Sequence, residues 1–165
     1  LVKDLPGNNE AKAETIDNNL QHEIVKKMSS NSVYYGKLSE MLKKIIMQRK
    51  IEAMSYEEYL RQVVELAEAI LHPETSGSYP DEVKDSAARR ALYDYFEQNV
   101  ELTIDVDGAI RVSIRPEWKR NFQKQQRIRL AIYQKLLLHN YTEDKATEET
   151  NNVFDIAQRQ EEYDA

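Results

Sequence analysis

Apolar residues recur every three or four positions along most of this 165-residue chain, and this spacing constrains its fold more than any other feature. The spacing places apolar side chains on one face of an α-helix, and that face must be buried against another element. It predicts helices over about 10–28, 38–46, 56–70, 86–98 and 121–139. Residues 29–32 interrupt the pattern, as do residues 72–80, whose two Pro, one Gly and three Ser or Thr predict a loop between two helical halves.

Between residues 102 and 114 the apolar period changes to two. The alternating apolar positions are Leu102, Ile104 and Val106, followed by Ile110, Val112 and Ile114. Asp107-Gly108 lies between the two runs, and this pair favours a hairpin because both turn positions must tolerate positive φ. The expected fold class is therefore mainly α, a compact multi-helix domain with one short antiparallel β-hairpin at about 102–114. A lone hairpin is marginal in water, so its apolar face is expected to lie on the helices.

The chain is short enough for one domain. We expect a linker over 1–9, a single helical domain over 10–139 and an acidic C-terminal segment over 140–165. That segment is expected to be either a weakly docked helix or disordered. The chain has no cysteine, which excludes disulfides and thiolate chemistry. It has no apolar run of about 18 residues, so no membrane span is expected. The start has neither an initiator methionine nor a signal core, which indicates a piece of a longer protein.

Positive charge is concentrated in one stretch. Residues 111–135 hold eight Lys or Arg and one acid, Glu117, in a chain whose net charge is −6. Residues 140–165 carry eight acids and two bases, a net charge of −6 that equals the value for the whole chain. The low pI is therefore no argument against a polyanionic partner. The residues predicted to contact phosphates are Arg111, Arg115, Lys119, Arg120, Lys124, Arg127 and Arg129.

Three interpretations of this basic stretch stay open. A charge run is usually a solvated helix face, but this one lacks the interleaved acids that such a face carries at i,i+4. The others are contact with nucleic-acid phosphates and contact with an acidic protein surface, including the chain's own segment 143–164. Trp118, the single tryptophan, suits a core anchor better than a base-stacking platform.

No pattern for catalysis is present. Residues 103–114 resemble a calcium loop only in the middle, because Thr103 and Ile114 stand where Asp and Glu ligands belong. The three histidines are far apart in sequence, and no glycine-rich phosphate loop or nucleophile elbow occurs. We expect no catalytic residue, no metal site and no cofactor in this chain.

Several segments together resemble the C-terminal region of the motor (restriction, R) subunit of type I restriction-modification enzymes. In that family an A-L-Y-D-N-L segment is followed by a W-R-G-N segment and a basic helix. The similar segments here are Ala91-Leu92-Tyr93-Asp94, residues 102–114, Trp118-Lys119-Arg120-Asn121 and residues 128–132, with 34–40 and 56–67 upstream. The chain departs from the pattern at Tyr95-Phe96, and Arg120 replaces the family's glycine.

The resemblance implies a non-catalytic domain of a bacterial, cytoplasmic, ATP-dependent DNA translocase and endonuclease. Its ATP, Mg²⁺ and catalytic motifs would belong to the nuclease and helicase domains on the N-terminal side. Its implied roles are assembly with the methyltransferase and specificity subunits, contact with the helicase domains of its own chain and sequence-independent binding to the backbone of double-stranded DNA. The expected structural anchors for assembly are Tyr93, Asp94, Trp118 and Asn121. The alternative is a protein-interaction or structural module without DNA contact.

Overall fold

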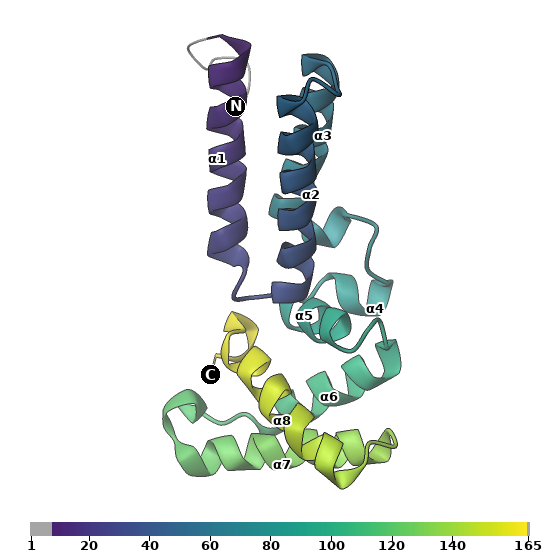
Figure 1. Cartoon of the computed structure of the whole chain (residues 1–165). Coiled ribbons are helices and arrows are strands. Elements are labelled where there is room, and N and C mark those ends of the chain that lie inside the picture. Colours follow the sequence, from purple (N-terminus) through teal and green to yellow (C-terminus); the bar gives the residue numbers. More distant parts are fainter. Residues whose placement is uncertain (1–7, 165) are drawn as a thin grey trace. The chain divides into compact units, whose positions relative to one another are not determined.

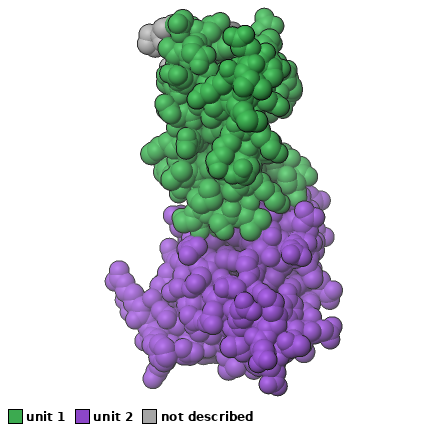
Figure 2. All heavy atoms as spheres, in the orientation of Figure 1, with its two compact units in different colours: residues 1–78 green, residues 79–165 purple. Residues whose placement is uncertain are grey.

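The computed structural model describes residues 8–164, which form eight α-helices, three short 3-10 helices and no β-strand. The contacts divide the chain into two compact units, residues 1–78 (unit 1) and 79–165 (unit 2), drawn in two colours in Figure 2. The expected helical character is confirmed. The boundary between the units lies in the predicted loop at 72–80.

Unit 1 is a bundle of three long helices that lie side by side (Figure 1): α1 (Asn9–Lys27), α2 (Ser32–Lys50) and α3 (Tyr56–Leu71). A short 3-10 helix, η1 (Pro73–Thr75), follows them. Each long helix begins at a side-chain cap, provided by Asn8, Asn31 and Ser55. The Ser55 hydroxyl accepts a hydrogen bond from the Glu58 amide at 3.1 Å, which satisfies an amide that the helix leaves unpaired.

One buried polar contact ties the three helices of unit 1 together. Asp17 on α1 accepts hydrogen bonds from Arg49 of α2 and from the Tyr59 hydroxyl of α3, both at 2.7 Å. The Arg49 guanidinium also lies 5.2 Å from the centre of the Tyr59 ring. This contact pairs a buried carboxylate with a cation, as burial of a charge requires.

Unit 2 is built around α7 (Phe122–Leu138), which packs against α6 (Val100–Ser113) and α8 (Glu143–Gln158). The unit begins with α4 (Asp81–Lys84) and α5 (Ala87–Tyr95), and it also contains η2 (Trp118–Arg120) and η3 (Glu161–Tyr163). Its core contains Leu92, Phe96, Leu102, Val106, Ile110, Trp118, Ile128, Ile132, Leu136, Val153, Phe154 and Tyr163.

The hairpin expected at 102–114 is wrong, because residues 102–113 belong to α6 and Ile114 is its C-cap. Asn99 caps the helix by accepting a hydrogen bond from the Leu102 amide at 3.0 Å. Leu102, Val106 and Ile110 lie four residues apart and are buried, so a helical stripe was present within the alternating pattern. The expected turn Asp107-Gly108 lies inside the helix, and Gly108 does not have positive φ. Packing against α5 and α7 therefore overrode the local turn signal.

The two ends of the chain also differ in detail from the expected boundaries. Of the linker expected at 1–9, residues 1–7 lie outside the described part of the chain, and Asn9 already belongs to α1. The acidic segment 140–165 contributes α8 and η3 to unit 2 and buries Val153, Phe154 and Tyr163. The described core of unit 2 thus extends past residue 139, the expected end of the helical domain.

Candidate functional site

The seven predicted phosphate-contacting residues lie along the end of α6, the connection that contains η2, and α7. Their surroundings separate them into two groups. Arg111, Lys119 and Arg129 are held by contacts within unit 2, whereas Arg115, Arg120, Lys124 and Arg127 have no carboxylate partner among residues 8–164.

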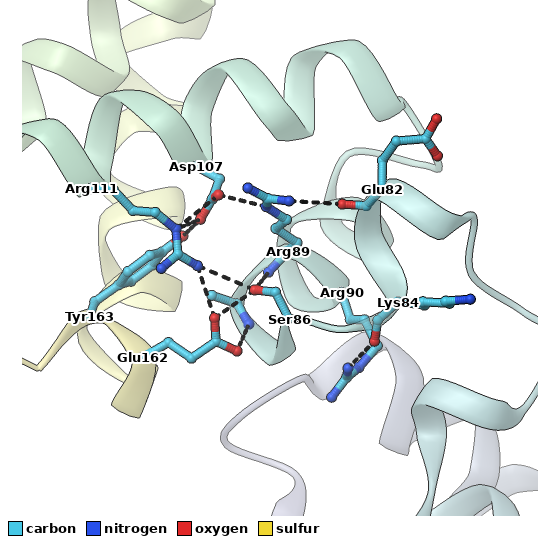
Figure 3. A network of polar contacts seen from close by, with 10 residues as sticks. Glu82, Lys84, Ser86, Arg89, Arg90, Asp107, Arg111, Glu162 and Tyr163 are labelled. Atoms are coloured by element: carbon cyan, nitrogen blue, oxygen red, sulfur yellow. Dashed lines mark hydrogen bonds and ion pairs between the residues drawn. The ribbon is translucent and has the colours of Figure 1, made fainter.

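Arg111 is occupied by two carboxylates. Its Nε donates to both oxygens of Asp107, at 2.9 and 3.0 Å, and its Nη2 donates to Glu162 at 2.9 Å (Figure 3). The guanidinium also lies 5.2 Å from the centre of the Tyr163 ring. Burial alone would lower the pKa of Arg111, but these hydrogen bonds outweigh it and raise the pKa. Its charge is therefore already balanced and is poorly placed to meet a phosphate.

Asp107 is the centre of this network and is fully buried, with 0% of its surface exposed. Besides Arg111, it accepts hydrogen bonds from Arg89 Nε and from the Tyr163 hydroxyl, each at 2.7 Å (Figure 3). Burial would raise the pKa of Asp107, but the donors together lower it below its usual range. The network joins α5, α6 and η3, so it is a structural site that holds the C-terminal residues in place.

Glu162 provides a second attachment for the C-terminal residues. It accepts hydrogen bonds from the Ser86 hydroxyl at 2.6 Å and the Ala88 amide at 3.3 Å, at the start of α5. Burial opposes ionisation of Glu162, yet the hydrogen bonds from Ser86, Arg111 and backbone amides lower its pKa. An acidic residue beside the first turn of a helix is also favoured by the helix dipole.

Trp118 and Lys119 connect η2 to the same C-terminal segment. The Trp118 side chain is 1% exposed, meets the Phe154 ring edge-on at 5.8 Å and donates from Nε1 to the Tyr163 carbonyl at 2.7 Å. Lys119 forms an ion pair with Asp164. Trp118 therefore lies in the core of unit 2, where a nucleic-acid base has no access to its ring.

Arg129 lies against α8. Its guanidinium lies 3.9 Å from the centre of the Phe154 ring and donates to the Asn151 side chain at 2.5 Å. A guanidinium stacked on an aromatic face contributes to packing as well as to charge. Arg129 thus joins α7 to α8.

The remaining four cations point to solvent or to main-chain carbonyl groups. Arg115, Arg120 and Arg127 are exposed, and Lys124 is partly exposed. Arg115 donates to the carbonyls of Val112 and Ile114, at 2.9 and 2.6 Å, and Lys124 donates to the Pro116 carbonyl at 2.6 Å. Carbonyl groups do not neutralise a charge, so these four residues keep an unbalanced charge. They lie in the connection between α6 and α7 and on the first turns of α7, and are here called the junction cations.

The expected structural anchors have different roles. Tyr93 is buried on α5 and meets the Tyr79 ring edge-on at 5.9 Å. Asp94 accepts a hydrogen bond from the Tyr79 hydroxyl at 2.5 Å. Asn121 caps α7 by accepting from the Lys124 amide at 3.1 Å, so it aligns the helix that carries Lys124 and Arg127.

Sequence reasoning missed two features of unit 2. The first is the Asp107 network, for which the i,i+4 spacing of Asp107 and Arg111 on one helix was a usable signal. The second is an open groove of about 490 Å³ between α6 and α7, lined by residues such as Ile104, Val112 and Leu138. The sequence pattern that could have indicated this groove is the spacing of Ala131, Lys135 and Leu138. Steps of four and three residues place them on one side of α7, the side that faces the groove.

Within residues 8–164, no group of three or more His, Asp or Glu side chains is arranged to hold a metal ion. None of the described helices combines the length and the apolar character that crossing a bilayer requires. Comparisons with protein-family models, with curated proteins and with solved structures give no match.

Proposed function

We propose that this chain is a non-catalytic C-terminal domain of a type I restriction-enzyme motor subunit, which binds the DNA backbone and helps to attach the motor to the methyltransferase core. The observation that carries the proposal is the set of junction cations, Arg115, Arg120, Lys124 and Arg127, without a carboxylate partner in the described chain. The family itself is proposed from the segments around Ala91–Asp94 and Trp118–Asn121 quoted above. ATP and Mg²⁺ would act in other domains of the parent subunit, in the bacterial cytoplasm.

The electrostatic argument depends on where charge is left unbalanced. The chain carries a net charge of −6, but its field near the junction cations is set by charges within a Debye length, about 8 Å at physiological salt. No carboxylate of residues 8–164 pairs with these four side chains, so they can bind phosphates and release the cations condensed on the DNA without first breaking an ion pair with an acid.

The expected binding is independent of DNA sequence. Arginine and lysine side chains of different reach, on a loop and on the first turns of α7, suit phosphate contacts, which position a protein without reading bases. Trp118 is buried, so it supplies no stacking platform. Phe122, two residues after Arg120, is an exposed aromatic side chain that an unpaired base could reach.

The assembly role is supported by apolar surface on the same helix. Phe122, Leu130 and Leu138 of α7 are all more than half exposed, with Phe122 at 72%. Exposed apolar side chains are typical of protein-contact surfaces where they lie together, as Leu138 does with Val112 in the groove between α6 and α7. We propose that the methyltransferase and specificity subunits, or the helicase domains of the parent chain, cover part of α7.

The DNA part of the proposal is tested with a duplex of about 20 base pairs over a salt series from about 50 to 200 mM. The wild-type chain should give a slope of log K against log salt on the order of −3 to −4, because each contacted phosphate adds about −0.9. Reversal of the four junction cations to Glu should flatten the slope and abolish binding at the higher salt concentration.

The matched control reverses four exposed lysines of unit 1, Lys26, Lys37, Lys44 and Lys50, and therefore changes the net charge by the same amount. This variant should keep most of the wild-type slope. Equal loss of binding in both variants would show an effect of net charge alone and would contradict the proposed surface.

A protein-interaction module without DNA contact is the second candidate, favoured by the exposed apolar residues of α7. It predicts that the junction-cation variant leaves DNA affinity of the assembled enzyme unchanged. It also predicts that a parent motor subunit with the junction cations reversed captures less methyltransferase than the wild-type subunit does. The two measurements together separate the candidates.

A further inference from the structure

The groove between α6 and α7 has a floor of small residues. Gly108 and Ala109 of α6 face Ala131 of α7 across it, and its volume is about 490 Å³. A Cβ placed on Gly108 would meet no atom within 4 Å, so the space above this position is open. Small residues on two neighbouring helices allow a third helix to approach closely and to place its own side chains between them.

Two large apolar side chains are left exposed in the groove. Val112 of α6 is 76% exposed and Leu138 of α7 is 73% exposed. They lie at opposite ends, because α6 and α7 run in opposite directions: His139, just after α7, contacts Asp105 in the first half of α6 at 2.8 Å. The groove therefore exposes one large apolar side chain towards each end, and exposure of apolar surface to water is unfavourable.

Charge distinguishes the two ends of the groove. At the Val112 end, the Arg115 guanidinium is bonded to the Val112 carbonyl, and the Lys124 amine to the Pro116 carbonyl. Arg127 lies one turn before Ala131 on the same side of α7. At the Leu138 end, the carboxylate of Asp105 is paired with His139. The cations at the Val112 end have no carboxylate partner among the described residues, whereas the carboxylate at the Leu138 end is already bonded to His139.

We propose that this groove binds an amphipathic helix of another protein, with apolar residues along one stripe and carboxylates over Arg115, Lys124 and Arg127. The apolar stripe would fill the space between Val112 and Leu138, and the carboxylates would balance the positive end. A DNA duplex would use the same three cations but has no apolar side chains for the floor, so the duplex and the helix exclude each other at this end of the groove. The inference rests on the assembly part of the proposed function and names the kind of segment that the partner offers.

The probe is a designed peptide of about 18 residues, or about five turns, with leucines on one helical stripe and glutamates beside it. The control peptide has the same composition in an order that scatters the leucines. Both are titrated into the isotope-labelled full chain, and backbone amide shifts are followed by NMR. We expect shifts centred on Gly108, Ala131 and Lys135, and binding at least about tenfold tighter for the amphipathic peptide.

Two variants test the groove itself. Ala131→Trp fills the floor without a change in charge and should weaken the amphipathic peptide by at least about tenfold, with duplex binding unchanged. Ala11→Trp, at an exposed position on α1 of unit 1, should leave both affinities at the wild-type value. Equal affinity of the two peptides, shifts away from the groove, or full peptide binding by Ala131→Trp would each overturn the proposal.

Other occupants give different results. If Ala131→Trp abolishes a dimer seen by sedimentation in the wild type, the groove binds a second copy and the proposal is wrong. The proposal is equally wrong if duplex DNA shifts Gly108 and Ala131 and loses affinity in Ala131→Trp. If duplex binding fails altogether while peptide binding holds, the DNA part of the proposed function fails and the groove proposal stands.

Discussion

Asp107 shows how one buried residue organises unit 2. Its carboxylate is removed from water and accepts hydrogen bonds from Arg89, Arg111 and Tyr163, which belong to three different elements. An ionised carboxylate is stable in such a place only when donors replace its water. The same donors explain why Arg111 is unavailable to a phosphate although it belongs to the basic stretch.

We expect Asp107→Asn to destabilise the chain by about 2–3 kcal/mol. The amide would direct an N–H group at one of the donors, would leave Arg89 without a countercharge and would leave Arg111 with Glu162 alone. A fully buried ion pair costs about 3–5 kcal/mol when one partner is removed, and the effect is smaller here because both arginines are about one-third exposed. Urea unfolding at neutral pH measures the loss, and Asp155→Asn at an exposed position of α8 should stay within about 0.5 kcal/mol of wild type.

The same residues predict how stability depends on pH. The folded-state pKa values of Asp107 and Glu162 lie below their usual values of 3.8 and 4.5. A carboxyl group with a lowered folded pKa stabilises the chain above its unfolded pKa, and this contribution is lost as the pH falls through the folded pKa.

The unfolding free energy should therefore fall as the pH is lowered from about 5 towards 3, and Asp107→Asn should show a smaller fall. The measurement is urea unfolding at a series of pH values. An unchanged pH dependence in Asp107→Asn, with Asp155→Asn as reference, would mean that other carboxyl groups cause the acid sensitivity.

At the scale of the element, α6 shows that one stretch of sequence can contain two periodicities. The spacing of Leu102, Val106 and Ile110 is typical of one face of a helix. The alternation that includes Ile104 and Val112 is typical of a strand. In the helix, Asp107 and Arg111 are neighbours on one face and pair with each other. In this helix the Val112 side chain is exposed to solvent, on the side of α6 that lines the groove.

A substitution of Gly108 tests whether this segment is a helix or a hairpin in solution. Because Gly108 lies inside α6 with open space around its Cα, Gly108→Ala should stabilise the chain by about 0.5–1 kcal/mol. In a hairpin turn with positive φ, the same change would be destabilising. Thermal or urea unfolding gives the sign directly.

Gly77 supplies the opposite control. It has a φ of +72° and also has open space around it, so only backbone conformation opposes a side chain there. Gly77→Ala should destabilise the chain by about 1 kcal/mol. The two alanine substitutions are thus expected to differ in sign.

At the scale of the molecule, unit 2 depends on its acidic C-terminal segment. The segment 140–165 supplies Phe154 against Trp118, and Tyr163 against Asp107. It also supplies Asp164 to Lys119 and Glu162 to Arg111. The negative charge of this segment is therefore partly balanced by the basic stretch, whereas the junction cations have no carboxylate partner among residues 8–164.

We expect a fragment of residues 79–165 to fold cooperatively and a fragment of residues 79–139 to remain unfolded. The shorter fragment lacks the large buried side chains Phe154 and Tyr163, and loss of each costs about 3–5 kcal/mol against a total stability of about 5–15 kcal/mol. The emission of Trp118, the single tryptophan, reports burial in the longer fragment and exposure in the shorter one. A cooperative unfolding transition for residues 79–139 would contradict the dependence on α8.

The sequence alone determined most of the helices, because an apolar stripe at a spacing of three or four residues and a capping side chain such as Ser55 act locally. It also determined where positive charge is concentrated. Only the tertiary structure decided that residues 102–113 belong to α6, since the choice between two periodicities depends on what Val106 and Ile110 pack against. It likewise decided which cations are left over. Asp107 pairs with Arg111 within one helix, but Glu162, Asp164 and Phe154, which meet Arg111, Lys119 and Arg129, lie far away in the chain. A pairing over such a distance leaves no trace in local spacing, and for that reason the candidate site narrowed from seven residues to four.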